Sequence, residues 1–320
     1  MQDAKRAPDV VTFGETMGLI MPIGTRGLEF APQLQKSFGG AESNVAIGLA
    51  RLGHSVGWFG RLGDDPFGRL IYKTLRGEGV DVSRAVLAKD EPTGMMLREI
   101  VAGQNSVYYY RRFSAASRMR PEHLDPTYIQ GAKILHITGI TPALSETCRE
   151  TVFAAVKIAK EAGTKVCFDP NLRLKLWSIE EARETILPLA AEADYFLPGL
   201  EELELLYDTD DFDTIVRHLN QLNAISVIKG AGEETRVLKD GKWTAVPYFQ
   251  VEEIVDTVGA GDAFCAGFIS GLLDGLDELE AVRLGNFLGA LVLGMEGDWE
   301  ALPNREYVQA RLENRKHVER

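Results

Sequence analysis

The chain has 320 residues, of which 45% are hydrophobic and 26% are charged, and its formal net charge is −12 at pH 7. This hydrophobic share is typical of globular proteins and is enough for a buried core, which excludes disorder of the bulk of the chain. The negative charge opposes attraction to nucleic acids and to anionic membranes, so we expect neither as a partner.

The 32 glycines follow no repeating period, which excludes a collagen-like or low-complexity chain. We therefore expect the glycines at turns and at places where the backbone closely approaches another group. Cys148, Cys167 and Cys265 are too few and too widely spaced for a disulfide framework or a zinc site, so we expect buried free thiols. No uncharged apolar run reaches about 18 residues, and Glu15 interrupts the first apolar stretch, so we expect no membrane span and no signal peptide. The expected location is the cytoplasm.

Strands and helices alternate in the first 80 or so residues, and this rhythm predicts a parallel sheet covered by helices. The predicted elements are a strand at Asp9–Gly14, a helix at Glu42–Gly53, a strand at Ser55–Arg61 and a helix at Pro66–Gly79.

The alternation breaks between Arg84 and Phe113. Here Thr93–Val101 and Ser106–Phe113 are predicted to be two strands joined by a turn over Ala102–Asn105. A hairpin inserted in an α/β chain suits a lid or a contact between subunits.

The alternation then resumes and continues to the last helices, without a linker or an internal repeat. The predicted strands are Lys133–Ile137, Thr164–Asp169, Asp194–Leu197 and Ile225–Lys229, followed by a hairpin of Arg236–Lys239 and Trp243–Val246. The predicted helices are Ser145–Ala162, Ser178–Ala191, Phe212–Leu222, Ala260–Leu273, Leu279–Leu293 and Asn304–Glu313.

Four familiar motifs are absent: GxxxxGK[ST], HExxH, GxSxG and GxGxxG. The sequence therefore lacks the main motif evidence for a P-loop NTPase, a zinc protease, a serine hydrolase or a Rossmann dehydrogenase.

Asp256–Phe264 (DTVGAGDAF) is the densest candidate site. Gly259, Ala260 and Gly261 lead directly into a predicted helix, whose first amides and positive dipole end can hold an anion. Asp262 follows in the first turn, where a carboxylate can accept the proton of a hydroxyl group that attacks phosphorus. The alternative is an aspartate favoured by the helix dipole after an ordinary glycine turn, and we favour the site.

Gly39–Asn44 (GGAESN) is a second glycine-rich entry into a helix. Gly40 would admit a ligand to the backbone, and Asn44 offers a hydrogen-bond donor and an acceptor. A tight turn followed by a capped helix explains the same residues and is the simpler interpretation of this motif alone.

Tyr108–Arg112 (YYYRR) places Tyr109 and Arg111 on one face of a predicted strand. An aromatic ring beside a guanidinium suits an anionic ligand rich in hydroxyl groups, because a guanidinium can bind a carboxylate through two parallel hydrogen bonds. A solvated edge strand has the same composition and is slightly favoured for this motif alone.

Asp169–Trp177 (DPNLRLKLW) directly follows a predicted strand. Ligands of α/β folds bind beyond the carboxyl ends of the strands, so Asn171 and Arg173 are candidates, and an irregular polar loop is the alternative. The five histidines are scattered, and we expect His136 to be a core residue rather than a ligand.

Together these segments resemble the pfkB family of carbohydrate kinases, which have the ribokinase-like fold. DTVGAGDAFCAGF matches the C-terminal signature of that family, and GGAESNVAIGLARLG followed by GRLGDDPFG matches its N-terminal signature. YYYRRFSAAS, LHITGITPALS and FDPNLRLKLWS resemble segments of the members that phosphorylate 2-keto-3-deoxygluconate. The resemblance covers nearly the whole chain.

The resemblance implies an α/β three-layer sandwich, with a central, mostly parallel sheet, helices on both faces and a small β lid. We therefore expect a single kinase domain over residues 1–320, with a lid formed by about 15–38 and 84–113.

The resemblance also implies the roles of individual residues. Asp262 aligns with the catalytic base of the family. The family's anion hole for the transferring phosphate aligns with Gly259, Ala260 and Gly261. The residues implied to hold the sugar acid are Gly40, Asn44, Tyr109, Arg111 and Arg173, and those implied to lie near the nucleotide are Lys229, Gly230 and Asn286.

Three positions depart from the family pattern. Met96 stands where many relatives have tyrosine. The Asn-x-x-Glu motif linked to magnesium aligns with Gly199–Glu202, so Glu202 alone is retained as the implied metal ligand. The nucleotide loop LxGxxG reads KGAGEET here.

The implied reaction is the phosphorylation of 2-keto-3-deoxygluconate at its C6 hydroxyl, with ATP and Mg²⁺ as cofactors; the family also admits a monovalent cation. The alternatives are a kinase for fructose or 5-keto-2-deoxygluconate, and a sensor that binds a sugar or nucleotide without catalysis. Two arginines favour an acid over a neutral sugar, and the lid strands favour a homo-oligomer, a dimer or higher.

Overall fold

Eight strands form the central sheet of the computed structural model, which describes residues 7–24, 26–251 and 253–318. Their spatial order is β14 (Lys242–Pro247), β13 (Glu234–Lys239), β12 (Ile225–Ile228), β11 (Tyr195–Phe196), β10 (Lys165–Asp169), β9 (Ile134–Thr138), β1 (Val10–Phe13) and β4 (Val56–Phe59). The strands from β4 to β12 pair in parallel, and β13 and β14 pair antiparallel. The parallel strands are almost wholly buried, as expected for a sheet covered on both faces.

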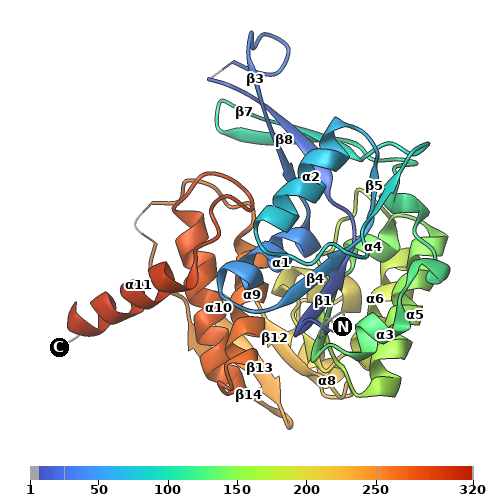
Figure 1. Cartoon of the computed structure of the whole chain (residues 1–320). Coiled ribbons are helices and arrows are strands. Elements are labelled where there is room, and N and C mark those ends of the chain that lie inside the picture. The colour runs from blue at the N-terminus through green and yellow to red at the C-terminus, as the bar shows by residue number, and fades with distance from the viewer. Residues whose placement is uncertain (1–6, 25, 252, 319–320) are drawn as a thin grey trace, which may run out of the picture.

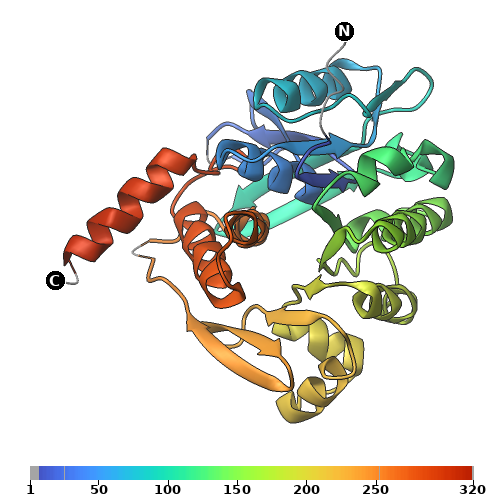
Figure 2. The ribbon, with the colours of Figure 1, turned by 60° about the horizontal axis from the view of Figure 1, so that its bottom comes forward.

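Helices cover both faces of this sheet (Figures 1 and 2). Val10 and Val11 are neighbours on β1 and point to opposite faces, so each belongs to a different hydrophobic core. The Val10 core is built with α1 (Ala41–Arg51), α2 (Pro66–Gly77), α9 (Ala260–Leu273), α10 (Glu278–Leu293) and α11 (Arg305–Val318). The Val11 core is built with α3 (Pro126–Gln130), α4 (Ile140–Ala143), α5 (Glu146–Ala162), α6 (Ile179–Glu192), α7 (Leu200–Tyr207) and α8 (Phe212–Leu219). The predicted α/β fold class is confirmed.

A second sheet of four strands stands at the top of Figure 1. Its order is β3 (Leu34–Gly39), β2 (Met17–Pro22), β7 (Met95–Val101) and β8 (Gln104–Tyr110). These strands come from the two segments that the sequence assigns to a lid. They lie near the carboxyl-terminal ends of β10 and β12 of the central sheet.

The turn between β7 and β8 is shorter than the predicted Ala102–Asn105. Ala102 and Gly103 form it alone, with φ angles of 51° and 78°. A two-residue turn in which both residues are left-handed matches the twist of the two strands, so pairing already starts at Gln104, opposite Val101.

The predicted strand Ser106–Phe113 is also wrong at its end, because β8 stops at Tyr110. Arg111 therefore does not share a strand face with Tyr109. The Arg111 guanidinium pairs instead with the buried Glu15 carboxylate, two residues before β2.

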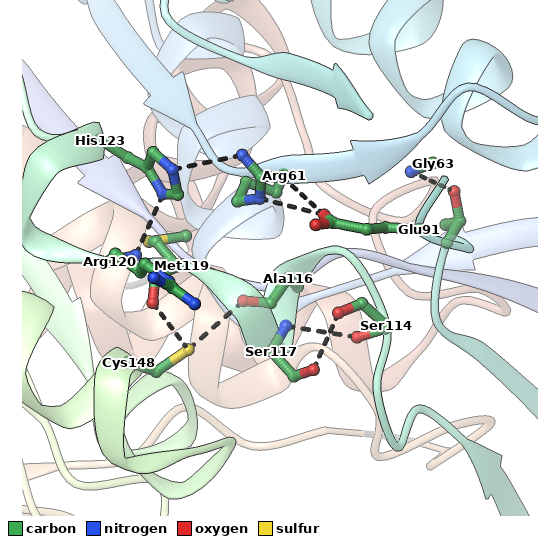
Figure 3. Close-up of polar contacts among 11 residues, drawn as sticks. Arg61, Gly63, Glu91, Ser114, Ala116, Ser117, Met119, Arg120, His123 and Cys148 are labelled. Carbon is green, nitrogen blue, oxygen red and sulfur yellow. Dashed lines mark hydrogen bonds and ion pairs between the residues drawn. The ribbon is translucent and has the colours of Figure 1, made fainter. Parts of the chain in front are cut away.

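Polar contacts hold the chain where it passes between the four-stranded sheet and the rest of the fold (Figure 3). Arg61, in β5 (Arg61–Gly63), pairs with Glu91 at 2.6 Å between Nη2 and Oε2. The Gly63 amide donates to Thr93 Oγ1 at 2.9 Å. Beyond β8, Ser117 Oγ donates to the Ser114 carbonyl at 2.8 Å. The contacts of Arg61 and Gly63 thus fix the segment before β7 to β5.

Several smaller features complete the fold. Helix α7 has no counterpart among the predicted elements, nor does the short strand β6 (Val86–Ala88), which pairs with β5. All three cysteines are buried free thiols, as expected. His136 is a buried core residue, with Nδ1 2.9 Å from Thr12 Oγ1. Among the residues that the structure describes, no helix combines the length and apolar character needed to cross a bilayer.

Candidate active site

A cavity of about 1420 Å³ lies between the four-stranded sheet and the carboxyl ends of the central parallel strands. Most of the predicted site residues line it: Gly40, Asn44, Tyr109, Arg111, Arg173, Glu202, Lys229, Gly259, Gly261 and Asp262. Asn171 also lines it, whereas Ala260, Gly230 and Asn286 do not. Residues from distant parts of the chain therefore meet in one place, as the sequence predicts.

Helix α9 begins at this cavity. Gly259 precedes the helix with φ 79°, a left-handed conformation that suits glycine, and the first bond within the helix runs from the Ala263 amide to the Gly259 carbonyl. The amides of Ala260, Gly261 and Asp262 precede that bond, and such amides at a helix N-terminus can hold an anion.

Asp262 lies in the first turn of α9 and accepts a hydrogen bond from Asn44 Nδ2 at 2.7 Å. Burial raises the pKa of the Asp262 carboxyl to about 6, although the Asn44 amide acts in the opposite direction. A carboxylate with a pKa close to neutral can take a proton at physiological pH and release it again.

Asp298 is a second carboxylate beside Asp262, and the sequence analysis misses it. Asn44 Nδ2 also donates to Asp298 Oδ1 at 2.7 Å, so a single amide group bridges the two carboxylates. Burial and the nearby Asp262 carboxylate raise the pKa of Asp298 well above its usual range. A Cβ at Gly39 would lie 2.1 Å from Asp298 Oδ2, so a side chain at that position would have to displace Asp298.

Arg111 lines the cavity beside Glu15. Its guanidinium pairs with Glu15 and lies 5.4 Å from the ring centroid of Tyr109. Ser114 Oγ donates to Glu15 Oε1 at 3.1 Å, so the carboxylate is held from both sides. Because Glu15 is almost fully buried, much of the Arg111 charge is balanced within the protein.

The loop after β10 supplies two further cations. Arg173 and Lys175 both line the cavity, and Lys175 Nζ lies 5.7 Å from the Tyr109 ring centroid. Within the described part of the chain, Arg173 has no ion pair with a carboxylate. Arg173 is therefore the better placed of the two predicted arginines to bind an anionic ligand.

Lys229 lies at the end of β12 and faces β10. Its Nζ donates to Asp169 Oδ2 at 2.9 Å, and Cys265 Sγ donates to the same oxygen at 3.2 Å. Burial alone would lower the pKa of the Lys229 ammonium. The negative charge of Asp169 outweighs burial and raises this pKa, so Lys229 stays charged.

Glu202 is held by the backbone on both sides. Its Oε1 accepts from the Leu172 amide and its Oε2 from the Gly199 amide, each at 2.6 Å. No group of three or more His, Cys, Asp or Glu side chains in the described ranges is arranged to bind a metal. Mg²⁺ in phosphotransferases keeps several waters and binds one or two carboxylates together with phosphates, so Asp169 and Glu202 fit such a metal.

Gly230 and Asn286 lie outside the cavity lining. The Gly230 amide donates to the Tyr248 hydroxyl at 2.6 Å. Asn286 Oδ1 accepts from Thr235 Oγ1 at 2.7 Å, and its Nδ2 donates to the Val246 and Pro247 carbonyls. The Asn286 amide thus fastens the β13–β14 hairpin to α10, and the nucleotide roles of both residues stay predictions.

The chain is similar to known sugar kinases over nearly its whole length. Residues 7–305 match the pfkB family carbohydrate kinase. The chain is 40% identical over 316 residues to the 2-dehydro-3-deoxygluconokinase of Bacillus subtilis (strain 168), with 97% of each chain covered.

Two solved structures share the fold. The 2-dehydro-3-deoxygluconokinase of Thermotoga maritima has a TM-score of 0.84 at 27% identity, covering 94% of this chain and 97% of that one. An uncharacterized sugar kinase of Pyrococcus horikoshii in complex with ATP has a TM-score of 0.80 at 27% identity, covering 93% and 96%. With the family match spanning the sheet, the cavity and helix α9, the chain belongs to the pfkB family of carbohydrate kinases and is a sugar kinase.

Proposed function

We propose that this kinase transfers the terminal phosphate of ATP to the C6 hydroxyl of 2-keto-3-deoxygluconate (2-dehydro-3-deoxygluconate), giving 2-keto-3-deoxy-6-phosphogluconate. The observation that carries the proposal is that Arg111 and Arg173 face the same cavity as Asp262 and the N-terminus of α9. A carboxylate substrate would pair with Arg173, which has no ion pair with a carboxylate among the described residues, whereas a neutral sugar leaves that charge without a partner. The Bacillus subtilis relative supports the substrate, and the ATP complex of the Pyrococcus horikoshii kinase supports the phosphate donor.

In this proposal Asp262 is the catalytic base. Its carboxylate accepts the proton of the C6 hydroxyl as that oxygen attacks the terminal phosphorus, and Asn44 orients the carboxylate through its 2.7 Å hydrogen bond. Asp298, held by the same Asn44 amide, can hydrogen-bond to a sugar hydroxyl.

The transferring phosphate lies at the start of α9 in this mechanism. The amides of Ala260, Gly261 and Asp262 stabilise the charge that develops on it, and Lys229 adds a positive charge nearby. Asp169 and Glu202 would hold a bound Mg²⁺, which would supply positive charge to the phosphates. Whether a monovalent cation contributes can be measured by exchanging potassium for sodium salts.

The carboxylate of the substrate would bind at the end of the cavity near Tyr109. Arg111, already paired with Glu15, supplies oriented hydrogen-bond donors there, and Arg173 adds a positive charge to the same cavity, where it also opposes the rise in the pKa of Asp262 that burial causes. Tyr109 lines this end of the cavity, with its ring near Arg111 and Lys175.

A substrate panel tests the proposal. ADP release is measured with 2-keto-3-deoxygluconate, 5-keto-2-deoxygluconate and fructose, and the phosphorylated carbon is identified by ³¹P and ¹³C NMR. We expect the first sugar to give the highest kcat/KM, with phosphate at C6. A preference for either other sugar would refute the substrate, and sugar binding without transfer at any Mg²⁺ concentration would favour the sensor.

The same proposal assigns roles to the rest of the molecule. Residues 1–320 form one kinase domain, with a lid from about 15–38 and 84–113 that covers the sugar. Buried free thiols support a reducing compartment such as the cytoplasm. Two copies would associate through the outer face of the four-stranded sheet.

A further inference from the structure

A buried ion pair joins the four-stranded sheet to the segment that leads into α9. Arg98 of β7 donates to Asp256 through two parallel hydrogen bonds, of 2.8 Å from Nη1 to Oδ2 and 2.7 Å from Nη2 to Oδ1. The two side chains are only 9% and 10% exposed, although 158 positions separate them in the sequence. The pair is therefore a contact between the two halves of the cavity wall.

The Asp256 end of this pair shapes the entry to the proposed anion hole. Asp256 Oδ1 also accepts a hydrogen bond from the Val258 amide at 3.1 Å. Val258 is followed by Gly259, whose left-handed φ of 79° turns the chain into α9. One carboxylate thus holds both the guanidinium of the four-stranded sheet and the backbone immediately before the helix.

The Arg98 end is fixed within the four-stranded sheet. Arg98 Nε donates to Asn105 Oδ1 on β8 at 3.1 Å, so the guanidinium is braced by both strands of the hairpin. Arg98 and Asn105 line the same cavity as Tyr109 and Asp262. The hairpin and Asp256 are therefore joined through the single guanidinium of Arg98.

A stabilising role alone does not explain this pair. Taking two charges out of water costs much of what their attraction returns, so buried ion pairs contribute little net stability. Their parallel hydrogen bonds do impose a defined geometry. Asp256 stays ionised here, because Arg98 and the Val258 amide outweigh the effect of burial and lower its pKa.

We propose that Arg98 is a positioning residue for phosphoryl transfer: by binding Asp256 from the four-stranded sheet, it holds residues 256–261 in the conformation that presents the α9 amides to the phosphate. The proposal rests on the proposed kinase function of that helix start. It links the part of the molecule that covers the sugar to the part that stabilises the transferring group.

The test compares Arg98→Met, Asp256→Asn and the double variant with the wild type. A displacement of about 1 Å in a transfer site can cost about a hundredfold in rate, so we expect kcat to fall about ten- to a hundredfold in each single variant. The sugar KM should change less than about threefold, because Arg98 acts through the helix start. The double variant should be no slower than the slower single variant, because both changes break the same contact.

Arg236→Met is the matched control. It also removes a guanidinium from a half-buried ion pair, with Glu234 of the same strand β13, and Arg236 does not line the cavity. We expect it to lower thermal stability and to leave kcat of the folded enzyme unchanged. Arg98→Lys keeps the charge and should restore part of the lost turnover.

Hydrogen exchange of the ligand-free protein gives a readout that does not depend on the sugar. Amides in 256–261 should exchange faster in Arg98→Met than in the wild type, and their exchange should be unchanged in Arg236→Met. Unchanged exchange, or a large rise in sugar KM with kcat intact, would overturn the positioning role. If the wild type prefers another sugar, only the proposed substrate fails, and the variants are compared with that sugar.

Discussion

Asp262 is the residue on which the response of the enzyme to pH should depend. Burial raises the pKa of its carboxyl to about 6, and only the ionised form can accept a proton. The reactive fraction therefore falls as pH drops below the pKa. We expect kcat/KM to fall about tenfold per pH unit below about pH 6 and to be level above it, measured as initial rates of ADP release.

Asp262→Asn is the control for this profile. It keeps the size of the side chain and removes the base, so turnover should fall by about 10²–10⁴. The residual kcat/KM of the variant should no longer fall as pH drops below about 6. If kcat/KM of the variant still falls below about pH 6, a group other than Asp262 causes the pH dependence.

Arg173 should decide between acids and neutral sugars. Arg111 is balanced by Glu15, whereas Arg173 has no ion pair with a carboxylate among the described residues. A hydrogen bond to a charged group is worth about 1.5–3 kcal/mol, so Arg173→Gln should raise the KM of a sugar acid about ten- to a hundredfold. Turnover of fructose, where it is measurable, should be unaffected.

Two comparisons make the Arg173 result interpretable. Arg217→Gln removes a guanidinium from the exposed surface of α8 and should change neither substrate. An equal loss for fructose and for the acid would show that Arg173 supports the loop after β10 rather than the carboxylate.

The junction of β3 and α1 depends on the absence of a side chain. A Cβ at Gly39 would approach Asp298 Oδ2 to 2.1 Å, and Asp298 cannot easily move because it is buried and bonded to Asn44. Gly39→Ala should therefore displace the Asp298–Asn44 pair and lower kcat/KM about ten- to a hundredfold. Initial rates and thermal denaturation measure the two effects separately.

Gly77→Ala is the matched control for Gly39→Ala. Gly77 lies at the end of α2, and a Cβ there would meet nothing within 4 Å. Alanine in a helix is favoured over glycine by about 0.5–1 kcal/mol, so this variant should be slightly more stable and fully active. A fully active Gly39→Ala protein would show that Asp298 has no part in turnover.

Elements with strong local patterns could be predicted from the sequence. Strands β1, β9 and β10 are short apolar runs, and α5 ends at Gly163, which adopts a left-handed φ of 78°. The length of the β7–β8 turn could not be predicted, because Ala102 adopts a left-handed φ that is unusual for alanine. Helix α7 was not predicted because the residue before it, Gly199, has no side chain to cap the helix start.

The same distinction applies to the site. The glycines before Asp262 form a local motif, so the start of α9 could be located before the fold was known. Asp298 could not, because it matters only through Asn44, which lies 254 positions earlier in the chain. Glu15 likewise acquires its role only when Arg111 folds against it.

The molecule as a whole carries a net charge of −12, yet its proposed substrates are anions. The long-range field therefore opposes binding, and attraction must come from groups at the cavity. Arg173 and the start of α9 supply it locally. The carboxylates at the site are held by neighbouring donors: Asp169 by Lys229, and Asp262 by Asn44.

The outer face of the four-stranded sheet is an unusual surface for a monomer. Because side chains alternate along paired strands, Leu34, Tyr108 and Tyr110 point away from the cavity that Tyr109 lines. They are 52%, 48% and 66% exposed. Contiguous exposed apolar side chains of this kind mark interaction sites, so we expect two copies of the chain to pair through this face.

Light scattering after size exclusion tests this pairing. The wild type should have twice the mass of one chain at micromolar concentration, and the double variant Leu34→Asp with Tyr110→Glu should have the mass of one, because charges cannot be buried unpaired in an apolar interface. Leu279→Asp, on the exposed first turn of α10, introduces a similar charge elsewhere and should leave the dimer intact. A monomeric wild type, or a double variant that stays dimeric, would contradict the assignment of this face.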